Sequence, residues 1–209
     1  MKSLLKLSAL IDGINHRMGH FVKWLVLAAV VISAGNAVIR KIFGTSSNAF
    51  LEIQWYLFAA VFMLGAAYAF LENAHVRIDA LSSRFSARTR NWIDIGGMLL
   101  FLIPFCWILI QLSWPLVSLA YTSGEMSQNA GGLIRWPVYL LVPVGAVLLI
   151  LQSASEMIKR VAFLRGVAPD PLAHGSHQTE EELAAEVAEH EALELKKHQS
   201  QQAKKQEHK

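Results

Sequence analysis

Four long stretches without a charged residue constrain the fold of this chain more than any other feature. They cover residues 24–39, 53–71, 95–124 and 136–155. The hydrocarbon core of a bilayer is about 30 Å thick, and a helix needs about 20 apolar residues to cross it. The first stretch can be extended back to Phe21, because Lys23 can reach the interface with its long side chain. We therefore predict an all-α membrane protein with four transmembrane helices, at about residues 21–39, 51–71, 95–114 and 136–155.

The distribution of positive charge predicts the direction of the crossings. Sixteen of the 19 Lys and Arg residues lie before the first stretch, between the second and third, or after the fourth. The other two connections contain only Arg40, Lys41 and Arg135. We therefore expect both termini on the cytoplasmic side, with residues 1–20 as a cytoplasmic segment ahead of a membrane domain at 21–167.

The connection between the second and third spans has an amphipathic pattern. Over about residues 76–92 the apolar side chains recur on one helical face, whereas Arg84 and Arg88 lie elsewhere. Such a segment is typical of a helix that lies in the membrane interface, with its arginines toward anionic lipid headgroups. We predict an interfacial helix here, and a solvated loop is the alternative.

The third stretch is longer than one crossing requires. We place its membrane part near 95–114 and Pro115 at the outer interface, where a kink or a helix end is tolerable. The glycines and polar residues that follow, up to about residue 133, are typical of an external loop.

The C-terminal part differs sharply from the rest of the chain. Residues 168–209 contain 14 charged residues and a net charge of −4. Thr179 to Glu182 fits a capping box, so we predict a polar cytoplasmic tail that is partly helical or disordered. The preceding body is apolar and basic, and it lacks the Lys/Arg stripe with interleaved aromatics that marks nucleic-acid binding. We expect a lipid bilayer as its surroundings and no nucleic-acid partner.

Several kinds of chemistry have no residues to support them. The sequence has no phosphate-binding Walker loop and one cysteine, and no histidine falls within the four predicted spans. We expect no catalytic residue, no cofactor and no metal site, and hence no enzyme. An ionisable group inside the membrane is a default functional candidate. Glu52 is the ionisable residue that lies nearest to a membrane interior. It is either solvated at the outer interface or paired with Arg40, Lys41 or a partner subunit.

Two short strings flank the second span. Glu52-Ile-Gln54 opens it, and His75-Val-Arg77-Ile-Asp79 follows it. Together with Gly-Gly-Leu-Ile-Arg-Trp-Pro at 131–137, these strings resemble the small membrane subunit, of DctQ type, of the tripartite ATP-independent periplasmic (TRAP) transporters. The resemblance covers roughly residues 15–165 and leaves out the tail.

This resemblance implies a role in transport across a bacterial inner membrane. In such systems a periplasmic binding protein captures an organic acid, and a large multi-helix subunit moves it with sodium. The small permease subunit then acts as a scaffold for the large one, with a possible second task of docking the binding protein. The substrate class would be carboxylates, with 2-oxo acids and lactate as candidates, and sodium would bind the large subunit. Reasoning from the residues leaves a self-sufficient homo-oligomeric channel or exporter as the alternative, and a haem- or quinone-binding redox subunit as a third class.

The resemblance also nominates individual residues at each membrane face. Those expected near the outer face, in contact with a partner or the binding protein, are Glu52, Gln54, Trp55, Glu125, Ser127 and Arg135. Those expected at the cytoplasmic interface, where they would fix the turn after the second span, are His75, Arg77 and Asp79. Arg84 and Arg88 of the amphipathic segment are expected at the same interface. The alternatives are loop capping for the first group and contact with lipid headgroups for the second.

Overall fold

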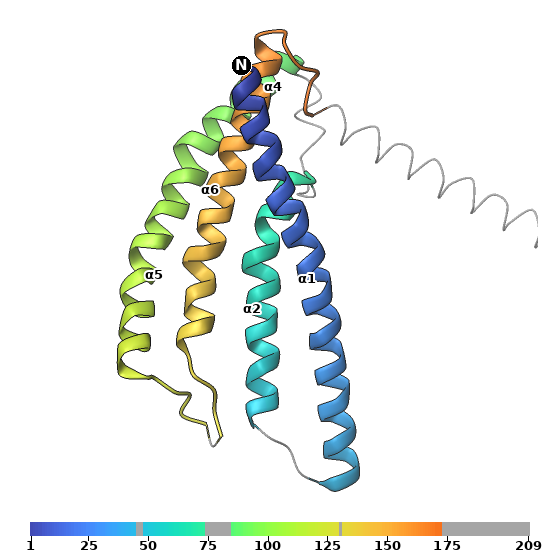
Figure 1. The fold of residues 1–209 in the computed structure, drawn as a ribbon, viewed down its shortest axis with the longest axis vertical. Helices are drawn as coiled ribbons and strands as arrows, with labels where there is room; N and C mark the ends of the chain where they lie inside the picture. Colours follow the sequence, from blue (N-terminus) through green and yellow to red (C-terminus); the bar gives the residue numbers. More distant parts are fainter. Residues whose placement is uncertain (45–47, 74–84, 130, 173–209) are drawn as a thin grey trace, which may run out of the picture. The chain divides into compact units, whose positions relative to one another are not determined.

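The computed structural model describes residues 1–44, 48–73, 85–129 and 131–172. The chain divides into two units, Met1–Ala168 and Pro169–Lys209, and the first contains all the helices described here. In chain order they are α1 (Lys2–Phe43), α2 (Asn48–Leu71), α4 (Ala87–Gly97), α5 (Ile103–Ser123) and α6 (Trp136–Leu164), with a π-helical turn, η1 (Met98–Leu102), between α4 and α5 (Figure 1).

Four helical segments are long and apolar enough to cross a membrane. They are Lys2–Phe43, Asn48–Leu71, Ala87–Ser123 and Trp136–Leu164. Among the described residues the only β-structure is one isolated bridge between Met126 and Ile134. The predictions of an all-helical chain and of four helices of membrane-spanning length are therefore confirmed.

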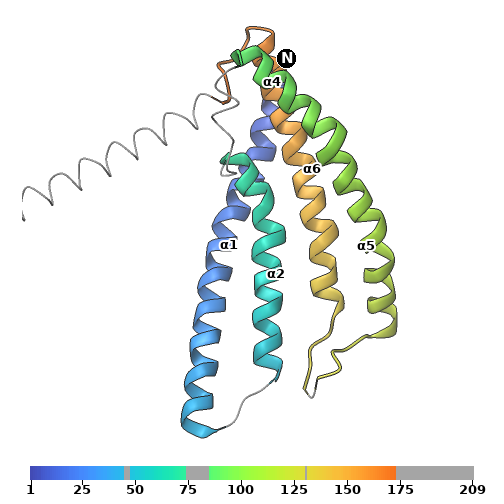
Figure 2. The same ribbon diagram turned by 180° about the vertical axis from the view of Figure 1, so that it is seen from behind.

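Helix α6 is the centre of this arrangement. It contacts α1, α2, α4 and α5, and Figures 1 and 2 show it between α5 and α2. A Cβ atom on Gly145 would lie only 2.6 Å from the carbonyl oxygen of Met63, so the backbones of α6 and α2 are in close contact there. Leu64 and Ala67 of α2 and Leu148 of α6 form the apolar core of this interface. Small residues permit such close approach between membrane helices.

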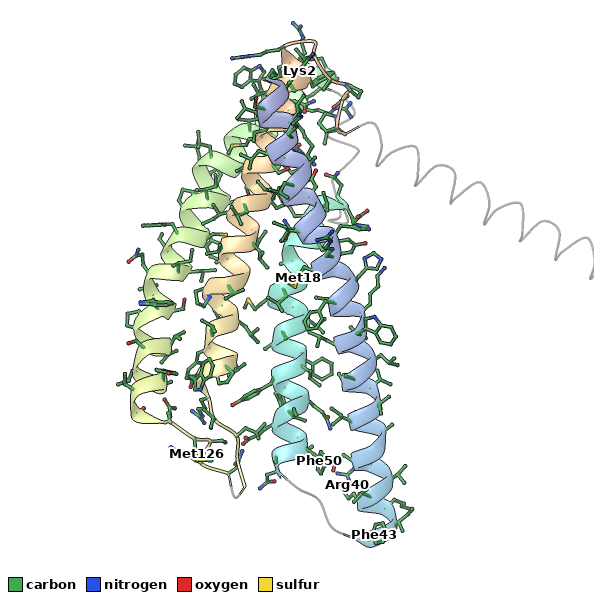
Figure 3. The ribbon with its side chains drawn as sticks, in the orientation of Figure 1. Lys2, Met18, Arg40, Phe43, Phe50 and Met126 are labelled. Carbon is green, nitrogen blue, oxygen red and sulfur yellow. The ribbon has the colours of Figure 1, made fainter. Side chains whose placement is uncertain are left out.

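Helix α1 has two partners along its length. The Tyr68 ring of α2 lies over Gly19, where an added Cβ would be 2.4 Å from the ring. Nearer the N-terminus, Ser8 of α1 contacts Ser155 of α6, with 2.7 Å between the hydroxyl oxygens. Figure 3 shows Lys2 at this end of the unit, and Phe43, Phe50 and Met126 at the other. Helix α1 also includes residues 2–20, which precede the predicted first span.

The third crossing is longer than predicted at both ends. Helix α5 continues through Pro115 to Ser123, so residues 116–123, which were expected to belong to an external loop, are helical. Val117 and Ala120 lie beyond the proline and are buried, and α5 packs against α6. Continued packing explains the continued helix, because proline is tolerated in membrane helices where neighbouring groups compensate for the missing N–H.

The predicted interfacial helix at 76–92 is only partly within the described residues. Residues 74–84 lie outside them, whereas residues 87–92 form the beginning of α4. The Ser86 hydroxyl caps α4 by accepting a hydrogen bond from the Thr89 N–H at 3.3 Å. Because α4 continues through η1 into α5, the last part of the predicted interfacial segment begins the third crossing. The tail beyond residue 172 lies outside the described residues.

Candidate functional site

Polar side chains gather at both ends of the helical unit, and the first group involves the outer loop, which we define as residues 124–135. Gly124 ends α5 in a left-handed conformation, with φ of 63°. The loop then folds back on itself: the Ser127 N–H donates to the Leu133 carbonyl at 2.9 Å, and the Arg135 N–H donates to the Glu125 carbonyl at 3.0 Å. The loop therefore has a defined hairpin-like backbone.

Gly132 is required by this fold of the outer loop. A Cβ atom at that position would lie 2.5 Å from the Cβ of Ser127 and 2.9 Å from the carbonyl oxygen of Asn129. Real side chains do not approach so closely, so only glycine allows the two sides of the loop to meet here. The requirement for glycine at this position of the predicted external loop is therefore steric.

Glu52, near the start of α2, is the anchor of the outer loop. Its carboxylate accepts hydrogen bonds from the Ser127 hydroxyl, from the Asn129 amide at 2.7 Å and from the Leu133 backbone N–H at 2.7 Å. Hydrogen bonds to an ionised acceptor are stronger than those between neutral groups. One carboxylate therefore fixes three points of the loop to α2.

Arg135 holds the end of the outer loop that leads into α6. Its guanidinium is 3.2 Å from the Glu125 carboxylate and donates to the Tyr139 hydroxyl at 3.4 Å. The hydrogen bond with Tyr139, supported by Glu125, raises the pKa of Arg135 above its already high ordinary value, so the side chain is charged at every physiological pH. On the other side, the Tyr56 hydroxyl donates to the Ile134 carbonyl at 3.0 Å.

These side chains enclose a polar hollow of about 280 Å³ between α2, the outer loop and the start of α6. Of the residues predicted for this face, the structure brings Glu52 to Ser127 and Glu125 to Arg135. Trp55 is 73% exposed. Among the described residues Gln54 makes no side-chain hydrogen bond to this cluster, and Glu52 takes its partners from the outer loop rather than from Arg40 or Lys41. The contacts of the predicted outer-face residues with partner proteins stay predictions.

The second polar group, at the cytoplasmic end predicted from charge, lies between α1 and α6. Gln152 is fully buried and accepts a hydrogen bond from the Asn15 amide at 2.7 Å. Its own amide donates to Asp12 at 3.0 Å. Asp12 also accepts from the Ser155 hydroxyl at 2.7 Å and from the Lys159 amine at 3.1 Å. Five side chains from two helices thus form one connected set.

Buried charges extend this set to α4. Glu156 and Arg160 are 2% and 1% exposed, and they form an ion pair one helical turn apart on α6. Lys159 also pairs with Glu156. Arg160 reaches across to Asp94 of α4, with 3.2 Å between Nη2 and Oδ2. Buried charges need partners of this kind because desolvation costs several kcal/mol per ion. We call the residues of both groups the inner charge network: Asp12, Asn15, Asp94, Gln152, Ser155, Glu156, Lys159 and Arg160.

The inner charge network was not predicted from the sequence. Asp12 and Asn15 were expected to belong to a cytoplasmic segment, and the fourth span was expected to end at Ser155, just before the charges. The signal was present: Gln152, Glu156 and Arg160 recur every four residues and therefore share one helical face. The partners on α1 are 137 or more residues away in the sequence, and no local pattern could pair them.

Most of the residues predicted for the cytoplasmic interface lie in a part of the chain that the structure does not describe. His75, Arg77, Asp79 and Arg84 lie outside the described residues. Arg88 is described, and it is an exposed residue in the first turn of α4. Within the described part of the chain, no three His, Cys, Asp or Glu side chains converge as a metal site.

A scan against protein-family models finds one match. The model for the DctQ component of tripartite ATP-independent periplasmic transporters matches residues 29–163. The chain belongs to the DctQ family. The match runs from the middle of α1 to the end of α6, so it includes Glu52 and the outer loop. It also includes the α6 side of the inner charge network, whereas Asp12 and Asn15 precede it. No curated protein matches the chain.

Membership confirms the resemblance that the strings around the second span suggested. A DctQ protein is the small component of a TRAP transporter, where it works with a large membrane component and a periplasmic binding protein. It is a transport subunit rather than an enzyme. Together with the four helices of membrane-spanning length, this assigns the chain to the inner membrane as a multi-pass protein.

Proposed function

We propose that this DctQ protein is the static scaffold of a sodium-driven importer for organic acids, namely carboxylates such as 2-oxo acids or lactate. One observation carries the proposal: the acidic groups within the membrane-spanning helices bind other groups of the same chain. Glu52 binds the outer loop, and Glu156 binds Lys159 and Arg160. A carboxylate engaged in this way is not free to bind a solute or a coupling ion.

The exposed faces of the helices support a large companion. Trp55, Phe58 and Phe62 are spaced along one face of α2, and each is more than half exposed. On the other side of α6, helix α5 exposes Trp107 and Trp114 to a similar degree. Apolar faces of this extent need a cover of lipid or protein, and we assign part of this surface to the large TRAP subunit, where sodium and substrate bind.

The outer loop is the second part of the proposal. We assign it, with Glu52, Glu125, Ser127 and Arg135, to the periplasmic side, where it would meet the docked binding protein. The charge distribution of the sequence supports this orientation, with both termini in the cytoplasm. The carboxylate of Glu52 holds the loop in one conformation, and a preformed surface binds at a lower entropic cost than a mobile one.

Copurification tests the scaffold role. An affinity tag on this chain should retain the large membrane subunit when the two are expressed together in mild detergent. A Trp55→Ala, Phe62→Ala variant should lower that retention if α2 contacts the large subunit. A chain that purifies only as its own oligomer, with no large subunit retained, would contradict the proposal and favour the self-sufficient channel or exporter.

A further inference from the structure

A partly open cavity lies between α4 and the end of α6. It has a volume of about 360 Å³ and is lined by Arg88, Trp92, Val161, Leu164 and Arg165. Two arginines therefore line it together with a tryptophan and two aliphatic residues, and no acidic residue lines it among those that the structure describes. We call it the arginine cavity.

Neither arginine of this cavity is neutralised by a carboxylate of the described residues. The acidic residues on the same two helices, Asp94 and Glu156, both bind Arg160. Among the described residues, Arg88 and Arg165 make no ion pair with any carboxylate, and both are exposed. Within the described part of the chain, the inner charge network thus engages the nearby acids, and the hydrogen-bond donors of Arg88 and Arg165 stay available to a ligand.

The position of Arg88 adds to this imbalance. It lies in the first turn of the eleven-residue helix α4, which contains no acidic residue in that turn. The N-terminal end of a helix has a partial positive charge, and cations there are unfavourable. An anion in the arginine cavity would interact favourably with the helix end and with both side chains.

The length of α6 places the cavity at headgroup level. The helix has 29 residues and is therefore about 43 Å long at 1.5 Å per residue. A bilayer is about 40–45 Å thick when its headgroup regions are included. With Trp136 at one interface, Arg165 reaches the headgroups of the opposite leaflet. Trp92 is of the residue type that is enriched at such interfaces.

We propose that the arginine cavity binds the phosphate group of an anionic glycerophospholipid. The phosphate lies between Arg88 and Arg165, because each planar guanidinium group can donate two parallel hydrogen bonds to phosphate oxygens. The glycerol backbone and the first methylene groups lie against Trp92, Val161 and Leu164. Basic pockets between membrane helices on the cytoplasmic side recognise such headgroups. A lipid bound here connects the start of the third crossing with the end of the fourth.

Lipid titration of the purified full-length chain, followed by native mass spectrometry, tests this site. The probes are phosphatidylglycerol, phosphatidylcholine as a zwitterionic lipid, and glycerol 3-phosphate as a soluble phosphate. The test variant is Arg88→Gln with Arg165→Gln. Its matched control is Arg17→Gln with Arg40→Gln, which removes two exposed arginines of α1. Each arginine near an anionic surface contributes about 1 kcal/mol, so we expect the test variant to bind phosphatidylglycerol about 10–30-fold more weakly.

The control variant should lose less than about two-fold, because its two arginines are exposed on α1, outside the arginine cavity, where salt screens their charge. An Arg88→Lys, Arg165→Lys variant should give an intermediate loss, since it keeps the charge but not the paired hydrogen bonds. Equal losses in test and control variants would overturn the proposal, as would equal affinity for phosphatidylcholine. Glycerol 3-phosphate binding as tightly as the lipid would assign the cavity to a soluble phosphate instead. The measurement needs neither substrate nor transport partner, so its outcome is independent of the proposed importer.

Discussion

Glu52 at the outer loop and the carboxylates of the inner charge network are satisfied in different ways. At the outer loop, Glu52 receives three hydrogen bonds from uncharged donors that are close together in the sequence. In the inner charge network, Asp12, Asp94 and Glu156 are neutralised by Lys159 and Arg160 across three helices. The first arrangement fixes one loop. The second determines how whole helices pack, so the same kind of side chain has a local role at one end and a global role at the other.

Breaking the inner charge network should have the largest effect. Arg160→Ala removes one of the two cations that pair with the buried Glu156, and removing one member of a buried ion pair costs about 3–5 kcal/mol. We expect a large loss of stability in thermal unfolding of the detergent-solubilised chain. Arg17→Ala, which removes an exposed arginine of α1, should change stability by less than about 0.5 kcal/mol. Equal effects of the two substitutions would show that the network is not a determinant of packing.

Removing Glu52 should have a smaller and more local effect. Glu52→Ala leaves three donors of the outer loop without this acceptor, and because these groups are only partly buried, water replaces part of the lost hydrogen bonding. Because these donors all belong to the outer loop, hydrogen exchange at the Leu133 amide should become faster while exchange in α6 stays unchanged. Faster exchange throughout α6 would mean that Glu52 supports the whole unit and would remove the contrast between the two sites.

Gly132→Ala should perturb the same loop through sterics alone. The added methyl group would contact Ser127 and the Asn129 carbonyl, and overpacking of this kind costs about 1–2 kcal/mol at a surface loop that can partly adjust. Circular dichroism melts together with exchange at Leu133 measure the effect. Gly13→Ala is the control, since nothing lies within 4 Å of a Cβ there, and this variant should be as stable as the parent or slightly more so.

Gln54→Ala should have the smallest effect. Gln54 is two residues from Glu52 and contributes no side-chain hydrogen bond to the outer loop among the described residues, so stability should change by less than about 0.5 kcal/mol. This variant is informative in the copurification experiment. Normal folding with weaker retention of the large subunit would identify Gln54 as a contact residue, whereas unchanged retention would leave Glu52 as the functional part of the string.

The sequence alone predicted the crossings but not all of their ends. Charge-free stretches indicate where a helix can be in lipid, and this is why the four spans were found. They do not indicate where a helix stops. Pro115 looked like an end, yet Val117 and Ala120 remain buried and the helix continues to Ser123.

The two polar sites differed in how well they could be predicted. Glu52, Ser127, Glu125 and Arg135 were nominated from short strings, but their pairing depends on how the outer loop folds back. The inner charge network was missed because Glu156 and Arg160 lie just beyond the predicted fourth span, and because Asp12 meets Lys159 only after α1 has packed on α6. Lys159 and Asp12, for example, are 147 residues apart. Charges beyond the end of a hydrophobic stretch look like loop residues until the fold shows that they are buried.

Sodium-dependent uptake into proteoliposomes tests the central claim most directly. Radiolabelled organic acid is measured with this chain alone, and with this chain, the large subunit and the binding protein together. Our account predicts uptake only in the complete system, because the carboxylates in the helices of this chain are engaged by its own residues. Sodium-driven uptake by the chain alone would contradict it.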